Sequence, residues 1–320
     1  MQRHHVSELA ELPLTLPGSV VTVGVFDGVH LGHQSILDHL LASARQRGLP
    51  SVCVTFSIHP RAVIGSEGPR QILSLEHRLE LLEAAGVEHV VVLEFSPELA
   101  ATEAEDFVER LLVRALGTRE LVIGHDTAVG RGRRGDGAFL VEAGLRYGFK
   151  VVALGEVLVD GQVASSTALR RAIAAGELVT ARRLLGRPVS LLGKVVHGDG
   201  RGATIGFPTA NLEVLSEAFP PLGVYAVSAR CAEGDLRAVM NYGLRPTFEQ
   251  GAARAVFEIH VLDREGLELY GQPMEVFLLR YLRREQRFAG VDELVAQIHR
   301  DVAAAREVPE QALPARHGAR

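Results

Sequence analysis

Short apolar runs alternate with helical patterns through the first 185 residues, and this alternation constrains the fold more than any other feature. Gly48 and Gly86 each follow a helical pattern in the position of a C-cap. Strands and helices that alternate in this way predict a doubly wound α/β domain. Five runs have the continuous apolar character of strands buried on both faces of a parallel sheet: residues 19–26, 51–56, 88–95, 119–124 and 149–154.

Side chains that cap helices also appear in this part of the chain. Ser74 precedes the helical run of residues 75–86, in the position of an N-cap. Thr102 and Glu105 have the spacing of a capping box. We therefore expect one helix to begin after Ser74 and another after Thr102.

The pattern changes after Gly186, where strand-like runs separated by Gly- and Pro-bearing turns replace the alternation. No helical pattern interrupts these runs before DELVAQIHRDVAAAREV near the end of the chain. This predicts a small antiparallel β-barrel closed by a C-terminal helix. The expected organisation is a first domain of residues 1–186, a second of residues 187–308, and a flexible tail of residues 309–320.

Composition and charge exclude several classes of protein. The formal net charge of −5 over 320 residues argues against nucleic acid as a partner, because neutralising phosphates needs a basic excess. The sequence contains no run of about 20 apolar residues, so neither a membrane-spanning segment nor an export segment is expected. Cys53 and Cys231 lie far apart and form no metal or redox pair, which favours a reducing, cytoplasmic location. The oligomeric state is not indicated.

The stretch GVFDGVHLGH (24–33) directly follows the first predicted strand, where ligands bind in an open parallel sheet. Gly28 and Gly32 allow the backbone to approach a ligand closely, and the helix that starts here directs N–H groups toward the same place. His30 and His33 are three positions apart, so they share one face of the first helical turn and can donate to phosphate oxygens. The stretch predicts a site that stabilises charge on a phosphate under attack.

Two plainer interpretations of these histidines stay open. Each histidine alone is typical of a surface or capping residue. A zinc ion would need three or four ligands, and His59 is the obvious further candidate. The position directly after a buried strand favours phosphate binding over both.

The second half contains no P-loop pattern, but HGDGRGATIGFPTAN (197–211) offers another phosphate cradle. Its glycines form a flexible cover, and Thr209 and Asn211 alternate onto one side of an extended segment. Two neutral oxygen ligands suit Mg²⁺, although a polar turn with a cap would look similar. In AVFEIHV, a period of two leaves Glu258 and His260 on one face, which is either a solvated strand face or a catalytic one.

These motifs resemble blocks of a known enzyme family. GVFDGVHLGH resembles the signature of nucleotidyltransferases that join an adenylyl group to a small phosphate and release pyrophosphate. TFSIHPR, VASSTALRRAIAAGEL and ARRLLGRP resemble, in order, further blocks of the bifunctional riboflavin kinase/FAD synthetases. Five further stretches resemble the flavokinase half of the same family: GKVVHGDGRGATIGFPTANLE, GVYAV, NYGLRPTF, FEIHVLD and LYGQPMEVFLLRYLRREQRF.

The resemblance implies a Rossmann-like nucleotidyltransferase domain followed by a flavokinase barrel. Riboflavin would be phosphorylated to FMN with ATP as co-substrate, and FMN would be adenylylated to FAD. The implied partners are riboflavin, FMN and ATP, and the implied cofactor is Mg²⁺, bound by Thr209 and Asn211.

The resemblance also implies roles for single residues. Glu258 is implied as the base that acts on the ribityl hydroxyl of riboflavin, His30 and His33 are implied as catalytic groups of adenylylation, and no role is implied for His260. The implied ATP- and phosphate-binding residues are Gly24, Phe26, Asp27, Gly28, Gly32, Ser165, Ser166, Thr167, Arg170, Gly198, Gly202 and Gly206. The implied flavin-binding residues are His59, Asp126, Asn241 and Arg245.

One loop departs from the family pattern. The family usually has Gly-x-Asp-Phe-x-Phe-Gly, whereas this chain has GHDTAVG, with Thr127 and Val129 in place of the aromatic residues. Ile58 likewise replaces the usual proline before His59. The adjoining GRGRRG (130–135) fits a dinucleotide-binding fingerprint, but its first glycine does not directly follow a strand, which favours a mobile basic loop near phosphates over a dehydrogenase site.

Three functions are compatible with these observations. The first is a bifunctional enzyme that makes FMN and then FAD. The second is a monofunctional riboflavin kinase with an impaired or regulatory N-terminal domain, and the third is a non-catalytic flavin-binding protein. The polar residues kept at both predicted sites favour the first.

Overall fold

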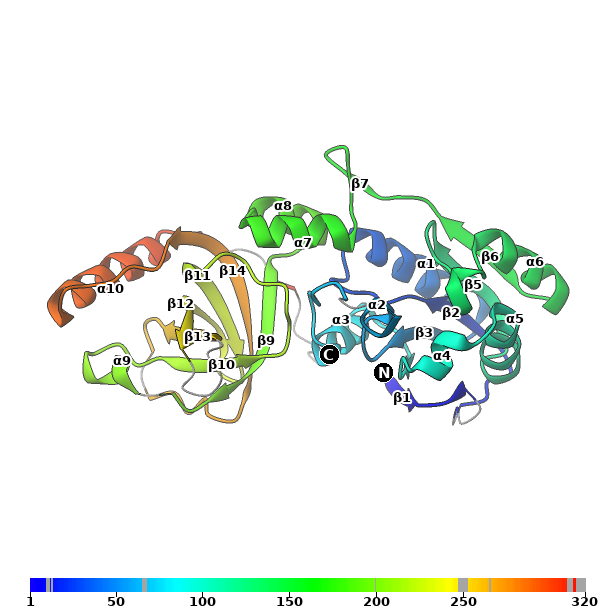
Figure 1. The fold of residues 1–320 in the computed structure, drawn as a ribbon, viewed down its shortest axis with the longest axis horizontal. Coiled ribbons are helices and arrows are strands. Elements are labelled where there is room, and N and C mark those ends of the chain that lie inside the picture. Colours follow the sequence, from blue (N-terminus) through cyan, green and yellow to red (C-terminus); the bar gives the residue numbers. More distant parts are fainter. Residues whose placement is uncertain are drawn as a thin grey trace. The chain divides into compact units, whose positions relative to one another are not determined.

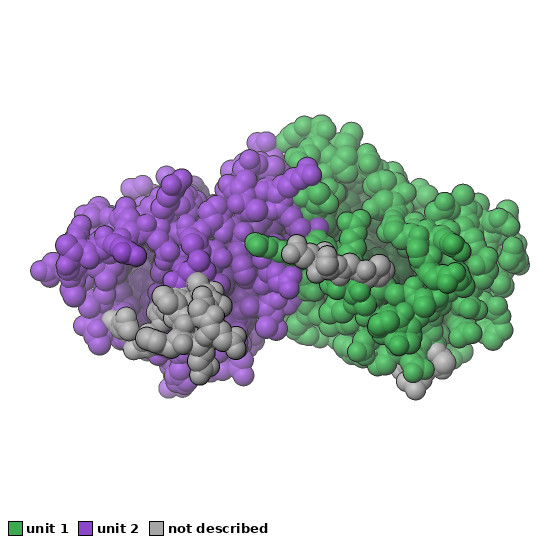
Figure 2. Space-filling model, in the orientation of Figure 1, with its two compact units in different colours: residues 1–71, 75–168, 315–320 green, residues 72–74, 169–314 purple. Residues whose placement is uncertain are grey.

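The computed structural model describes residues 1–9, 12, 14–64, 68–198, 200–246, 253–264, 266–309 and 313–314. Most of the predicted flexible tail therefore lies outside the described residues. The chain divides into two compact units (Figure 1 and Figure 2). The first contains residues 1–71, 75–168 and 315–320, and the second contains residues 72–74 and 169–314. Helix α7 (Ser166–Ala175) spans the division.

The first unit is built on an all-parallel six-stranded sheet in the order β1-β4-β3-β2-β5-β6 (Figure 1). The doubly wound α/β prediction is confirmed. The strands are β1 (Gln2–Val6), β2 (Ser19–Val23), β3 (Ser51–Phe56), β4 (His89–Leu93), β5 (Thr118–Gly124) and β6 (Lys150–Leu154), with a hairpin of β7 (Leu158–Val159) and β8 (Gln162–Val163). The helices are α1 (Leu31–Arg47), α2 (Pro60–Ile64), α3 (Leu75–Ala85), α4 (Pro97–Ala101), α5 (Ala104–Phe107), the π-helix η2 (Val108–Ala115), the 3₁₀ turn η3 (Arg131–Arg133) and α6 (Gly137–Tyr147).

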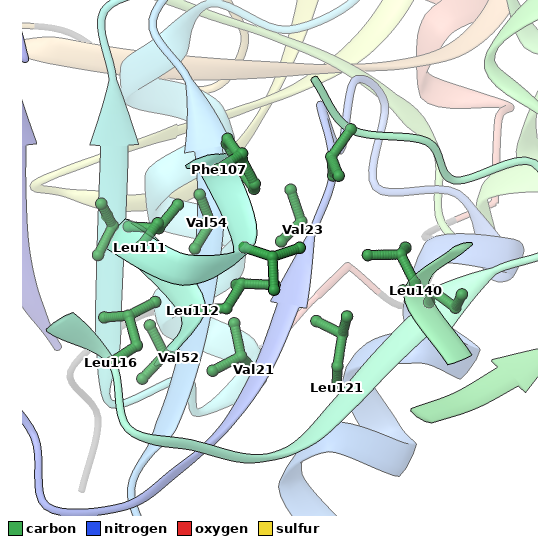
Figure 3. Close-up of a cluster of buried hydrophobic side chains, with 14 of the residues drawn as sticks. Val21, Val23, Val52, Val54, Phe107, Leu111, Leu112, Leu116, Leu121 and Leu140 are labelled. Carbon is green, nitrogen blue, oxygen red and sulfur yellow. The ribbon is translucent and has the colours of Figure 1, made fainter. Parts of the chain in front are cut away.

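One face of this sheet carries a large apolar core (Figure 3). Val21 and Val23 of β2 alternate with residues of the opposite face, and both pack in a cluster with Leu111 and Leu112 of η2. Helix α1 contacts β2, β3 and β5. The sheet is thus covered by helices, and its carboxyl edge remains as the place where loops can bind a ligand.

The edges of the sheet differ from the prediction. β1 was not among the predicted strands, yet it pairs with β4 from Gln2↔His89 to Val6↔Leu93. Its sequence, QRHHV, lacks the apolar run typical of a buried strand because it is an edge strand. The prediction that residues 149–154 form a strand buried on both faces is wrong in one respect: β6 is the other edge, with Lys150 and Ala153 exposed.

The predicted helix caps are partly correct. Gly48 ends α1 with φ of 62°, Gly86 has φ of 98°, and α3 begins directly after Ser74. The predicted capping box is wrong: Thr102 lies at the C-terminal end of α4, and its hydroxyl donates to Glu98 O at 3.2 Å. A helix begins earlier than predicted, because Ser96 Oγ accepts from Leu99 N and caps the start of α4.

The second unit contains the predicted closed antiparallel barrel, in the order β10-β13-β12-β11-β14-β9 (Figure 1). A four-residue helix interrupts the strands, contrary to the prediction, because the glycine-rich segment turns back on itself there. The strands are β9 (Val189–Val196), β10 (Ala210–Val214), β11 (Gly223–Cys231), β12 (Gly234–Pro246), β13 (Ala253–Val261) and β14 (Pro273–Arg283). The helices are α7, α8 (Leu178–Leu185), α9 (Arg201–Thr204) and α10 (Val291–Arg306).

Helix α10 packs on the outer face of the barrel. Val302 and Ala305 of α10 form an apolar cluster with Val224 of β11 and Val239 of β12. Arg283 fixes the helix further, because its guanidinium donates to both carboxylate oxygens of Asp301 at 2.7–3.0 Å. The C-terminal helix therefore defines one outer face of the barrel, and the predicted kinase residues lie on that same face.

Candidate active sites

The first candidate site lies at the carboxyl edge of the parallel sheet. β2 lies between β3 and β5, so the segments that follow these three strands meet at one edge. This arrangement brings the loop of residues 24–30 to the same edge as the residues after β3, which include His59, and those after β5, which include Asp126. In doubly wound sheets this switch point between strands is where ligands bind.

The two histidines of GVFDGVHLGH lie together at the start of α1. His30 is the N-cap, so the expectation that both residues belong to the first helical turn is wrong for His30, which is extended. Its Nδ1 accepts from His33 N at 3.4 Å, and the two rings stack with centroids 3.7 Å apart. Because Nδ1 accepts, the neutral His30 ring carries its proton on Nε2, where it is a donor.

The backbone before the helix has an unusual conformation. Phe26, Gly28 and Val29 have φ values of 54°, 92° and 41°. A positive φ is ordinary for glycine but unfavourable for phenylalanine and for a β-branched valine. Such strain persists only where surrounding contacts hold the loop, and it is concentrated at functional sites.

The predicted block VASST packs against this loop. Ser166 Oγ donates to Asp27 O at 2.8 Å, and a Cβ on Gly32 would lie 2.9 Å from Ala164 O. Ser165 Oγ accepts from Ala168 N and caps α7, on which Thr167 and Arg170 also lie. Two segments far apart in the sequence are thus joined into one structure, and Gly32 is required for their close approach.

The loops after β3 and β5 contribute further residues to this edge. His59 Nδ1 accepts from Arg61 N at 3.2 Å at the start of α2. Asp126 is exposed, and its carbonyl accepts from Arg133 at 2.6 Å. Arg131 forms an ion pair with Glu103 at 2.7 Å, so both arginines tie the basic turn to its surroundings.

The departures from the family pattern have local roles in the structure. Thr127 Oγ1 accepts from Gly124 N at 3.0 Å, and Val129 is buried and forms a bridge with Gly135. These contacts shape the turn that holds Asp126. The dehydrogenase interpretation is wrong for the same segment, because β5 ends at Gly124 and a separate turn precedes Gly130.

The second candidate site lies on the outer face of the barrel. Asn211 of β10, Glu258 of β13 and Asn241 of β12 are directly paired across the three strands, so their side chains form one row. Asn241 Nδ2 donates to Glu258 Oε2 at 3.3 Å. The inner face carries Tyr242 and Phe257, whose rings stack at 4.7 Å, so the row is separated from the apolar interior.

The glycine-rich segment lies against this row. A Cβ on Gly198 would lie 1.9 Å from Asn211 Nδ2, and one on Gly202 would lie 3.3 Å from Thr209 Oγ1 and 2.3 Å from Phe207 O. A side chain at position 198 would displace Asn211, and one at position 202 would clash with the backbone just before Thr209. Gly206 has φ of 87°, and the side chain of Arg245 lies outside the described residues.

The structure gives His260 a role that the sequence did not indicate. His260 lies on the same face as Glu258, and its Nδ1 is 2.9 Å from Pro208 O, directly before Thr209. The Phe207 ring lies edge-on to His260 and to His299 of α10, with centroids 5.4 and 5.1 Å away. These contacts fix the segment PTAN (residues 208–211). They become visible only when the strands are paired.

Membrane spans, metal clusters and cysteine pairs bear on other possible functions. Among the described residues, no helix has the length and apolar character needed to span a membrane. The described ranges also contain no group of three or more His, Cys, Asp or Glu side chains that could hold a metal ion. Cys53 and Cys231 are both buried free thiols.

Comparisons with known proteins cover nearly the whole chain. The FAD synthetase family model matches residues 13–168, and the riboflavin kinase family model matches residues 185–309. The bifunctional riboflavin kinase/FMN adenylyltransferase of Escherichia coli K12 is 41% identical over 292 residues, which is 91% of this chain and 92% of that protein. The Pseudomonas fluorescens protein of the same name is 40% identical, over 94% of this chain and 95% of that protein.

A solved structure also matches nearly the whole chain. A crystal structure from Streptococcus pneumoniae, described as a macrolide-efflux protein, aligns with a TM-score of 0.84 and 31% identity over 96% of this chain and 99% of that one. The family of this chain is shown by the two family models, which match separate and successive parts of it, and by the relatives named above. The chain therefore belongs to the family of bifunctional riboflavin kinase/FMN adenylyltransferases.

Proposed function

We propose that the protein phosphorylates riboflavin to FMN with ATP and then adenylylates FMN to FAD, releasing pyrophosphate. The observation that carries this proposal is the presence of two assembled polar sites, one in each compact unit, in the two parts matched by the two family models. The substrates are riboflavin, FMN and ATP. We assign adenylylation to residues 1–186 and phosphorylation to residues 187–308, since Gly186 caps α8 and β9 begins at Val189. The cytoplasm is the proposed location.

In the kinase step, Glu258 accepts the proton of the ribityl hydroxyl of riboflavin as that oxygen attacks the γ-phosphorus of ATP. The hydrogen bond from Asn241 orients the carboxylate. This role fits a half-buried carboxylate that lies beside the predicted phosphate cradle.

The residues of the cradle suit Mg²⁺. Thr209 and Asn211 supply a hydroxyl and an amide oxygen, and Gly198 leaves the space beside Asn211 that a Cβ would fill. Mg²⁺ binds few protein ligands and keeps oxygen ligands from water and phosphates. When bound, it would neutralise charge on the β- and γ-phosphate oxygens.

In the adenylyl step, a phosphate oxygen of FMN attacks the α-phosphorus of ATP, and pyrophosphate leaves. His30 Nε2 and His33 donate to the α-phosphate, on which negative charge grows in the transition state. The strained loop and the start of α1 supply backbone donors for the other phosphate oxygens. We assign His59 and Asp126, at the same edge of the sheet, to the flavin side of this site.

One experiment distinguishes the three functions. The purified protein is incubated with riboflavin, ATP and Mg²⁺, and the flavins are separated by chromatography. Formation of FMN followed by FAD supports the bifunctional enzyme. FMN without FAD, even when FMN is supplied, would indicate a monofunctional kinase, and bound riboflavin without turnover would indicate a flavin-binding protein.

A further inference from the structure

Arg78 is a buried arginine that no predicted site includes. It lies on α3 and is 4% exposed. Its guanidinium donates to Val25 O and to Phe56 O, both at 2.6 Å. Val25 is the second residue after β2, and Phe56 is the last residue of β3. One side chain thus ties together the carboxyl ends of two neighbouring strands.

The contact with Val25 fixes the strained part of the loop. Val25 O also accepts from Thr55 Oγ1 at 3.1 Å, so two donors hold this carbonyl. The peptide unit is planar, so the N–H of Phe26 points away from the direction of the Val25 carbonyl. Phe26 is the first residue with a positive φ, and Asp27, whose carbonyl accepts from Ser166, follows it. The orientation of the loop amides therefore depends on the guanidinium.

Stability alone does not explain an arginine at this position. Burial lowers the pKa of the Arg78 guanidinium, and the negative charge of the Asp27 carboxylate opposes this effect. Its Nε is also buried and has no hydrogen-bond partner within the described part of the chain. Replacing a buried charged group with well-packed apolar atoms is often neutral or stabilising. A buried charged residue is therefore expected where function requires it, even though apolar atoms would be at least as stable there.

We propose that Arg78 is a positioning residue for adenylyl transfer, which holds the backbone of residues 25–27 in the conformation that binds the ATP phosphates. This inference rests on the proposed function of the first unit. Arg78 acts through the carbonyls of Val25 and Phe56 and does not touch the substrate. Arginine is needed because its planar fork reaches two carbonyls at once, whereas a lysine is a single point charge.

The test compares Arg78→Ala and Arg78→Lys with the wild type. We expect kcat for FAD formation from FMN to fall about 10²-fold in Arg78→Ala, because a small misplacement of binding groups has an effect of that size. Arg78→Lys is expected to lose less, and the KM for ATP should change less than kcat. Guanidinium at millimolar concentration should restore part of the activity of Arg78→Ala.

Arg47→Ala is the matched control. Arg47 also lies in the first unit and donates to the buried Glu120 at 2.6 Å, but Glu120 is near the amino end of β5. Its loss should lower thermal stability, leave kcat for FAD formation unchanged and show no rescue by guanidinium. Riboflavin phosphorylation, measured in each variant, reports on the second unit, and the thermal midpoint of unfolding reports on the fold of the first.

Hydrogen exchange keeps the inference testable even if the wild type forms no FAD, in which case the proposed function fails separately. Amides of residues 24–30 should exchange faster in Arg78→Ala than in the wild type, with no change in residues 118–124. Unchanged exchange at residues 24–30 would overturn the inference. So would a kcat for FAD formation within threefold of the wild type, or a loss of kcat that guanidinium does not restore at all.

Discussion

At the scale of single residues, His30 combines two roles that substitution can separate. Its Nδ1 accepts from His33 N and caps α1, while its Nε2 is the donor that we assign to the α-phosphate. In the capping role, the ring Nδ1 only accepts a hydrogen bond, and the oxygen of a short polar side chain could do the same. The catalytic role requires a donor on the far side of the ring, which such a side chain lacks.

We predict that His30→Asn keeps the cap but loses catalysis. Asparagine is a good N-cap, so the thermal midpoint should stay near that of the wild type. The kcat for FAD formation should fall by about 10²–10³, the usual effect of removing one donor to a developing oxyanion. His30→Ala should lose the same activity and some stability as well. A normal kcat in His30→Asn would show that the histidine is only a cap.

We also predict that Glu258→Gln abolishes FMN formation and spares the adenylylation of supplied FMN. Glutamine can still accept from Asn241, so the row of side chains across the strands should persist. A general base contributes about 10²–10⁴-fold, and the loss of kcat should fall in that range. If the variant keeps more than about a tenth of the kinase kcat, Glu258 is not the base.

Some site residues could be read from the sequence and others could not. Asp27, His30 and His33 lie in the stretch that runs from a buried strand into the next helix, and the fold class alone places such residues at the carboxyl edge. Arg78 occupies a regular position in the helical run of α3, and nothing in that run distinguishes it from a surface arginine. Its partners, Val25 and Phe56, become visible only when the strands are paired.

At the scale of elements, the glycine-rich segment depends on the small size of its residues. We predict that Gly198→Ala greatly reduces riboflavin phosphorylation, because its Cβ would lie 1.9 Å from Asn211 Nδ2 and displace the amide. The requirement for Mg²⁺ should rise, which a magnesium titration of kinase activity measures. Gly200→Ala is not expected to match this loss, because nothing lies within 4 Å of its added Cβ, although its φ of 68° adds strain. Equal loss in both variants would show that the contact with Asn211 is not the cause.

The predicted elements were correct where the apolar pattern was strong. The central strands of the parallel sheet and the barrel strands other than β10 follow it closely, whereas β10 was expected only as an extended segment. β1 was missed because an edge strand has one free side and needs no apolar run, and Thr102 was misread because Ser96 starts a short helix before it. Local patterns do not reveal which neighbouring cap is used or which strand ends at an edge.

At the scale of the whole molecule, the two chemistries belong to units with separate cores. We predict that Glu258→Gln and His30→Asn complement each other when they are mixed. The first variant adenylylates FMN but cannot make it, and the second makes FMN but cannot adenylylate it. A mixture supplied with riboflavin and ATP should form FAD after a lag, measured by chromatography. If each variant alone keeps the one activity expected of it and the mixture forms no FAD, FMN does not leave the protein between the steps.

The barrel and the parallel sheet also differ in whether they offer a strand edge with which a second copy of the chain could pair in concentrated solution. The barrel is closed and has no free strand edge, whereas the parallel sheet ends at β1 and β6. β1 carries charged and polar residues, but β6 reads KVVAL and offers a more apolar edge for pairing between copies. Aggregation should therefore begin at β6. Ala153→Lys should slow the growth of light scattering on heating more than Ala232→Lys, which adds the same charge beside the closed barrel, and equal slowing would assign the effect to net charge.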